Sequence, residues 1–352
     1  MSLEEAKSCV FNQMEKGRLV SSAEVQGILK SLHEIELNMN EAEYLDKWIE
    51  DIANLSPFKA FILDQSINEI IVHDEENIQV EIHGSLVSTT WDNKDVCLKK
   101  YMEYLTIQEH QTWNYLKPFC SFKKVIQGIS FRITLIHQSL TPNSRPKIFL
   151  RKLRSHELNL SNFDLTFDES QCLRRMIYEK KNVIICGSTG SGKTTLLSSM
   201  LQEIPENEHV VLLEDVHELI LEKKFFTSLL ADEDSPKKTL KDYCKYSLRL
   251  RPDRIIIGEL RGEETVPFLL SMNNGHSGLM STIHAKSAKD APTRLAMLFS
   301  LYSDNQQISF ELALKLICAN VDYVIYMENK KMKEVVQIIG CEGTTPYCEK
   351  IF

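Results

Sequence analysis

The sequence lacks the patterns that mark several classes of protein. None of the nine cysteines lies in a Cys-x-x-Cys pair, so a zinc ribbon is not expected, and scattered, odd-numbered thiols fit a reducing compartment. The chain does not open on a basic segment followed by an apolar core, so no signal peptide is expected. No apolar run approaches the length of a membrane span. Together these absences predict a cytoplasmic protein.

A long basic run is also missing, and the formal net charge is −8. Wholesale electrostatic capture of nucleic acid is therefore not favoured, although net charge alone leaves a local basic groove open. Hydrophobic residues make up 43% of the chain, which is enough for an ordinary globular core. A length of 352 residues indicates two domains with room for a small appendage.

The spacing of apolar residues changes along the chain and predicts its organisation. Ser21 and Asn40 each begin a stretch in which apolar residues recur at helical intervals, which predicts short helices. These helices either form a small bundle or pack as an extension on the next domain. Strand-like runs follow, then a polar stretch, then alternating strands and helices. The predicted parts are a helical segment (1–58), an α+β domain (59–152), a linker (153–166) and an α/β domain (167–352).

The two larger parts differ in their predicted strands. The α+β domain is expected to hold one helix over 93–117 and the strands Ile70–Val72, Ile78–Ile82, Phe131–Ile136 and Ile148–Leu150. In the α/β domain, short and nearly continuous apolar runs between helices indicate a largely parallel sheet that is covered on both faces. Those runs are Val183–Cys186, Val210–Leu213, Ile255–Ile257, Met280–Ile283 and Val321–Tyr326, with Val335–Ile339 as an antiparallel edge hairpin.

The first of these runs leads into the loop Gly187-Ser188-Thr189-Gly190-Ser191-Gly192-Lys193-Thr194, and a helix follows. Glycines let the backbone turn its N–H groups toward phosphates, and the helix presents its positive end to the same charge. The full pattern in a strand–loop–helix context is specific, so we predict ATP binding by residues 187–195, including Thr195. Lys193 is expected to reach the β- and γ-phosphates, and Thr194 to ligate Mg²⁺.

Two carboxylates follow other predicted strands of the same domain. Glu214 ends the run Val210–Leu213, and Glu259 follows Ile255–Ile257. The carboxyl ends of parallel strands are where ligands bind in open α/β sheets, so both should converge on the phosphate loop. Glu259 is our first choice for orienting the attacking water. Glu214 is the second choice, acting on the water or in the magnesium shell.

A histidine completes the predicted site. His284 ends the run Met280–Ile283, so it should lie at the same sheet edge as Glu259. A lone histidine is more often structural than catalytic, and its position at this edge is what distinguishes His284.

Four segments in this order resemble the type II/type IV secretion ATPases, the motors of protein secretion, conjugation and type IV or tight-adherence pili. The phosphate loop is 187–194, and Leu213–Leu219 resembles the family's aspartate box. Leu248–Gly262 resembles its Walker B region, and Gly275–His284 resembles its histidine box. A phosphate loop alone is common, whereas the four together are highly specific. The likeness continues upstream and covers roughly 60–340.

The resemblance implies a RecA-like P-loop domain, preceded by a smaller α+β (PAS-like) domain and short N-terminal helices, in a homohexameric ring. Phe131–Thr134 and Phe149–Lys152 resemble the family's arginine-bearing strands, which implies that Arg132 and Arg151 contact phosphate. Further arginine candidates are Arg249, Arg251 and Arg261. The four-cysteine zinc insert usual in the type II secretion branch is absent, Gln138 stands where many relatives have proline, and the tail from Cys341 has no clear counterpart.

The function implied is a cytoplasmic ATPase that couples hydrolysis to a secretion or pilus machine. Its implied partners are copies of itself and inner-membrane platform proteins, which would bring it to the cytoplasmic face of the inner membrane. No direct nucleic-acid partner is expected. Two alternatives remain open, a RecA-like nucleic-acid translocase and a nucleotide-controlled scaffold that does not hydrolyse ATP. Acidic composition disfavours the first, and the two carboxylates disfavour the second.

Overall fold

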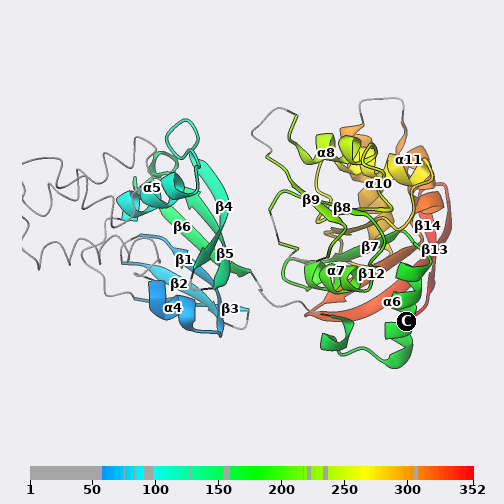
Figure 1. The fold of residues 1–352 in the computed structure, drawn as a ribbon, viewed down its shortest axis with the longest axis horizontal. Coiled ribbons are helices and arrows are strands. Elements are labelled where there is room, and N and C mark those ends of the chain that lie inside the picture. Colours follow the sequence, from blue (N-terminus) through cyan, green and yellow to red (C-terminus); the bar gives the residue numbers. More distant parts are fainter. Residues whose placement is uncertain are drawn as a thin grey trace, which may run out of the picture. The chain divides into compact units, whose positions relative to one another are not determined.

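The computed structural model describes residues 58–352, except 75, 83, 91–97, 127, 154–158, 217, 220–222, 233–236 and 304–307. The predicted N-terminal helices and part of the predicted linker lie outside the described residues. The chain forms two compact units, Met1–Ser155 and His156–Phe352, and we describe each by itself (Figure 1). Both units contain a sheet packed against helices, so the predicted mixed α/β class is confirmed.

Unit 1 is built on a six-stranded antiparallel sheet in the order β3-β2-β1-β6-β5-β4. Helices α4 and α5 share one apolar core with a single face of this sheet, in which Phe58, Tyr101, Ile133 and Leu150 are buried. The elements are α4 (Lys59–Leu63), β1 (Ile67–Val72), β2 (Ile78–Ile82), β3 (Ser85–Thr89), α5 (Leu98–Gln108), β4 (Phe119–Ile126), β5 (Ile129–Ile136) and β6 (Lys147–Leu153).

The helix predicted over 93–117 is shorter than the sequence suggests, because α5 ends at Gln108. His110 then adopts a left-handed conformation with φ 54°, and the backbone N–H of Gln111 donates to the carbonyl of Thr106. Both features terminate a helix. The following residues form a turn closed by the Asn114 side chain, which accepts from the backbone of Leu116 and Lys117.

Unit 2 is built on an eight-stranded sheet in the order β14-β13-β12-β7-β11-β10-β8-β9. The pairs from β12 through β9 are parallel, and β13 and β14 add antiparallel strands. The strands are β7 (Val183–Gly187), β8 (Val210–Glu214), β9 (Phe226–Leu230), β10 (Arg254–Ile257), β11 (Met280–Ile283), β12 (Tyr323–Glu328), β13 (Lys331–Glu342) and β14 (Thr345–Lys350).

Alternate residues of the central strands bury into two separate cores. Ile184 and Ile255 face one core, together with helices α8 to α11. Ile185 and Ile256 face the other, together with α6 and α7. Burial on both faces explains why these strands read as continuous apolar runs. The helices are α6 (Phe167–Tyr178), α7 (Lys193–Gln202), α8 (Leu240–Ser247), α9 (Thr265–Asn273), α10 (Asp290–Tyr302) and α11 (Phe310–Asn320).

The sequence did not predict four strands, and all four are edge strands of the two sheets. They are β3, β4, β9 and β14. The tail, to which the sequence assigned no role, forms β14 and then packs Ile351 and Phe352 against the core that holds α6 and α7. No helix among the described residues is long and apolar enough to cross a membrane.

Candidate nucleotide site

The predicted phosphate loop connects the end of β7 to the first residue of α7, Lys193. Gly187, Gly190 and Gly192 have φ of 150°, 73° and 97°, in a region that L side chains rarely adopt. A Cβ on Gly187 would also lie 2.2 Å from the carbonyl oxygen of Met327. The loop therefore needs glycine for its backbone conformation, and at Gly187 for space as well.

The ammonium group of Lys193 folds back over the loop. It donates to the carbonyl oxygens of Gly187 at 3.1 Å and Ser188 at 2.8 Å, and it lies 3.4 Å from Nδ1 of His284. Burial lowers the pKa of Lys193 below its ordinary value, and the nearby carboxylate of Glu259 opposes part of that shift. The ammonium group of Lys193 is therefore held at the start of the phosphate loop, beside Gly187 and Ser188.

His284 links Lys193 to Glu259, as their positions at neighbouring strand ends predict. Its Nε2 lies 2.8 Å from a carboxylate oxygen of Glu259. Because the ammonium can only donate, Nδ1 of the ring accepts and the ring proton belongs on Nε2, which donates to Glu259. The three side chains form a continuous polar chain across the carboxyl ends of β7, β11 and β10.

Glu214 lies at the end of β8, and unlike Glu259 its side chain binds backbone N–H groups. Its side chain is buried, and Oε1 accepts from the backbone N–H groups of Glu218 at 2.9 Å and Leu219 at 2.8 Å. Gly258 packs beside it, since a Cβ there would make an ordinary contact with Cγ of Glu214 at 3.5 Å. Glu214 therefore fixes the loop that follows its own strand, a role that sequence reasoning did not predict.

Asp215 and Arg261 form an ion pair beside Glu259. Nε of Arg261 also lies 3.8 Å from the second carboxylate oxygen of Glu259. Arg261 thus reaches the edge of the site, as its position in the Walker B-like segment allows. Arg249 and Arg251 lie in the turn that precedes β10, at the opposite end of that strand from Glu259.

The residues present fit a bound polyphosphate. Ser188, Thr189 and Gly190 at the tip of the loop are exposed, and Thr194 and Thr195 in the first turn of α7 are half-buried. The hydroxyl of Ser191 is buried and has no hydrogen-bond partner, which is rare unless a ligand or water supplies one. No group of three or more His, Cys, Asp or Glu side chains among the described residues could hold a metal ion by itself. At nucleotide sites Mg²⁺ is ordinarily bound through one or two protein oxygens together with substrate phosphates and water.

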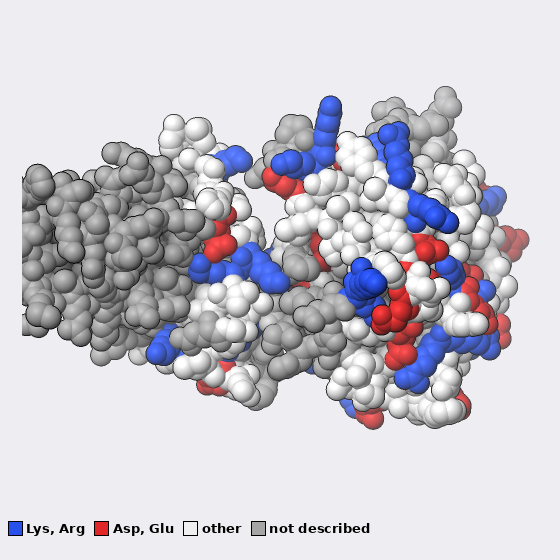
Figure 2. Space-filling model, viewed as in Figure 1, with Lys and Arg blue, Asp and Glu red and all other residues white. Residues whose placement is uncertain are grey.

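Arg132 and Arg151 are cross-strand neighbours in unit 1, on β5 and β6. Lys123 on β4 pairs with Arg132, and Glu69 on β1 pairs with Arg151, so one row crosses four strands. Figure 2 shows Lys and Arg side chains gathered where β1, β5 and β6 lie in Figure 1. These arginines are therefore placed together on one sheet, with a third cation beside them.

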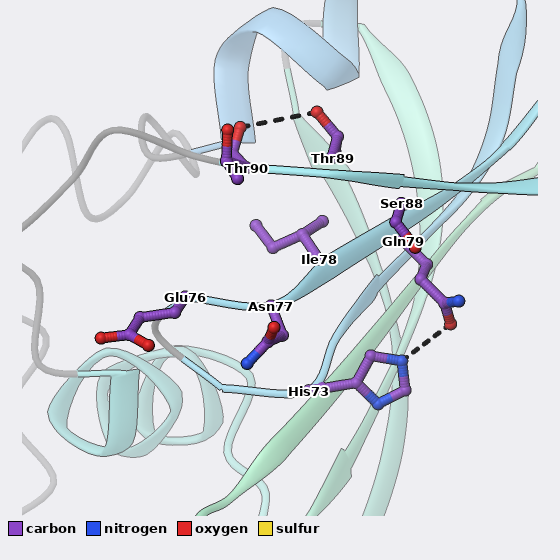
Figure 3. Close-up of a pocket in the computed structure, with 8 residues that line it drawn as sticks. All are labelled: His73, Glu76, Asn77, Ile78, Gln79, Ser88, Thr89 and Thr90. Atoms are coloured by element: carbon purple, nitrogen blue, oxygen red, sulfur yellow. Dashed lines mark hydrogen bonds between the residues drawn. The ribbon is translucent and has the colours of Figure 1, made fainter.

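A cavity of about 760 Å³ opens elsewhere in unit 1, at one end of β1, β2 and β3 (Figure 3). Seven of its eight lining residues are polar, and one of them, His73, has a ring nitrogen 2.9 Å from the side-chain oxygen of Gln79. None of the predicted site residues lines this cavity.

Comparison with known proteins agrees with the resemblance seen in the sequence. A family model described as "Type II/IV secretion system protein" matches residues 52–346. The type IV secretion system protein VirB11 of Brucella abortus is 30% identical over 209 residues, which are 58% of this chain and 54% of that protein. The match therefore spans about half the length of this curated relative.

Two solved structures share the fold. The ATPase DotB of Legionella pneumophila superposes with a TM-score of 0.59 and 17% identity, over 86% of this chain and 79% of that one. The pilus retraction motor PilT with bound ADP gives a TM-score of 0.57 and 20% identity, over 84% of this chain and 81% of that one. At these identities the likeness concerns the fold.

Proposed function

Because the chain belongs to the type II/IV secretion system protein family, we propose that it is a motor ATPase of a secretion or pilus machine. It hydrolyses ATP to ADP and phosphate in a RecA-like unit 2. The single observation that carries the proposal is the polar chain from Lys193 through His284 to Glu259. These three side chains join the predicted phosphate-binding cation to the predicted water-orienting carboxylate. PilT, which has a similar fold, is described with bound ADP.

Each residue has a role in this proposal. Backbone N–H groups of the loop and the ammonium of Lys193 bind the β- and γ-phosphates. Glu259 orients the attacking water and accepts its proton, while His284 holds the carboxylate in place. Thr194 would hold Mg²⁺, which supplies charge neutralisation on the phosphates when bound. Glu214 holds the backbone of Glu218 and Leu219 in position.

The rest of the motor is proposed from the family. Arg132 and Arg151 of unit 1 contact the phosphates, and an arginine near a γ-phosphate can raise the rate by orders of magnitude. The active form is a homohexamer in the cytoplasm that docks on inner-membrane platform proteins. Closure of the two units around ATP drives the machine.

The test is steady-state ATPase activity of the full chain under conditions where oligomers form. Glu259→Gln keeps the side-chain volume but removes the base, and we expect a loss of about 100-fold or more in kcat. Glu263→Gln is the matched control, because Glu263 is an exposed acid that pairs with Lys241. Activity of the control should stay near that of the wild type. An inactive wild type, or a Glu259→Gln variant with full activity, contradicts the assignment.

A further inference from the structure

The phosphate loop has a neighbour that the four sequence motifs do not include. The turn between β12 and β13 holds Asn329 and Lys330, both left-handed, with φ of 50° and 62°. Its backbone reaches the loop directly, since the N–H of Lys330 donates to the carbonyl oxygen of Ser191 at 3.0 Å. Two left-handed residues in succession make a tight hairpin turn, which fixes the direction in which Lys330 leaves the backbone.

Contacts at two glycines show how closely this turn approaches. A Cβ on Gly192 would lie 3.3 Å from Cα and 3.8 Å from Cβ of Lys330. On Gly187, a Cβ would collide with the carbonyl oxygen of Met327, just before the turn. The turn is therefore a side wall of the loop, and it leaves too little space at Gly192 for even a methyl group without pressing on the Cα of Lys330. Residue 330 is exposed, so its ammonium can swing over the loop.

The order of strands places this wall opposite the catalytic side chains. Strand β7, which leads into the loop, lies between β11 and β12. His284 follows β11, and Glu259 follows the next strand, β10, whereas Lys330 follows β12 on the other side. A nucleotide whose γ-phosphate faces Glu259 therefore extends its α-phosphate and nucleoside toward β12.

We propose that Lys330 is a further nucleotide-binding residue, whose ammonium contacts the phosphate at the nucleoside end of ATP and ADP. This inference rests on the proposed nucleotide site, and it adds the turn between β12 and β13 to the residues that form that site. Lys331 next to it serves a different purpose, because its ammonium forms an ion pair with Asp164 at 3.0 Å. Lys331 therefore provides a matched control for substitutions of Lys330.

The experiment measures binding of unlabelled ADP and ATP to the full-length protein by calorimetry, together with kcat and KM for ATP. Lys330→Gln removes the charge and keeps the chain length, and Lys331→Gln is the control. We expect Lys330→Gln to weaken ADP and ATP about three- to tenfold alike, with kcat within about twofold of wild type. Lys331→Gln should change neither nucleotide affinity nor kcat by more than about twofold.

Other outcomes separate this inference from the proposed function. If wild type binds nucleotide, Lys193→Ala abolishes binding and Lys330→Gln binds normally, the role of Lys330 is wrong and the proposed site stands. Inorganic pyrophosphate distinguishes the two ends of the site, because it lacks a nucleoside-linked phosphate. A loss of pyrophosphate binding in Lys330→Gln equal to that of ADP overturns the assignment to the nucleoside end. A wild type that binds neither nucleotide overturns the proposed function itself.

Discussion

Glu214 can be separated from Glu259 by comparing two substitutions at one position. Its Oε1 accepts two backbone N–H groups, and both the carboxylate and Leu219 are buried. Glu214→Gln retains a carbonyl oxygen that can accept the same bonds. Glu214→Ala removes the acceptor and leaves both donors without it. The pair of variants therefore distinguishes the loss of charge from the loss of the loop anchor.

The magnitude follows from the cost of an unsatisfied donor. A buried N–H that loses its partner costs about 1–3 kcal/mol, so two such groups cost roughly 2–6 kcal/mol, with the lower end applying if water reaches half-buried Glu218. Glu214→Gln exchanges a charged acceptor for a neutral one and should cost about 1 kcal/mol. We therefore expect Glu214→Ala to release the backbone amides of Glu218 and Leu219 and Glu214→Gln to keep them bound.

Amide hydrogen exchange at Glu218 and Leu219 measures this opening directly. Exchange at these two amides should accelerate about 30-fold or more in Glu214→Ala, and by less than about tenfold in Glu214→Gln. Global unfolding of unit 2 needs its own probe, because the three tryptophans, Trp48, Trp91 and Trp113, all belong to unit 1. Cys244 can be this probe, since burial raises the pKa of its thiol to about 12 and protects the thiol from labelling reagents until unit 2 unfolds.

Unchanged exchange at both amides in Glu214→Ala would refute the anchoring role. If the same variant also lost ATPase activity as fully as Glu259→Gln, Glu214 would act on the reaction itself. Retention of most activity in Glu214→Gln, with accelerated exchange in Glu214→Ala alone, would establish it as a positioning residue.

Two further predictions concern stability. Glu208→Ala should destabilise unit 2 by about 3–5 kcal/mol in denaturant titrations followed by Cys244 labelling, because it unpairs the fully buried Arg254, which Glu208 binds at 2.6 Å. The double variant Glu208→Leu with Arg254→Met should lose far less stability, because it leaves no buried charge unpaired. If the double variant and Glu208→Ala lost the same stability, this reasoning would be contradicted. Asp74 closes the β1–β2 turn. Burial alone would raise the pKa of its carboxyl, but hydrogen bonds from Glu76 and Asn77 outweigh it, so the pKa lies below 3.8. Its contribution is present above about pH 4 and is lost as the pH falls through the lowered pKa. Tryptophan-monitored unfolding of Asp74→Ala should therefore differ from wild type at pH 7 and converge with it in strong acid; a constant difference would contradict this.

Sequence reasoning succeeded where burial imposes a pattern. The strands Val183–Gly187 and Met280–Ile283 bury every residue, so their apolar runs were recognisable. The edge strand β3 has four exposed residues out of five, and β14 alternates exposed and half-buried positions without a buried one. An edge strand pairs on one side and buries little, so its sequence carries a weak period.

The candidate site shows the same division. Convergence of Glu259 and His284 followed from the rule that parallel strands end at one edge. The backbone bonds of Glu214 could not be predicted, since they require the amides of Glu218 and Leu219 to return to the end of β8. The contact of Lys330 with Ser191 was also missed. Its position in a hairpin turn between two apolar runs was readable, but the neighbour of that turn depends on strand order.

The placement of β7 between β11 and β12 also has a consequence for synthesis of the chain. The loop is fully walled only when β12 and its turn, about 140 residues after β7, have paired with it. A ribosome adding about 5–20 residues per second needs roughly 7 to 30 seconds to supply them. During that interval the emerging chain carries a phosphate loop without its second side, so on our proposal nucleotide stabilises the complete loop only after β12 and its turn have been synthesised.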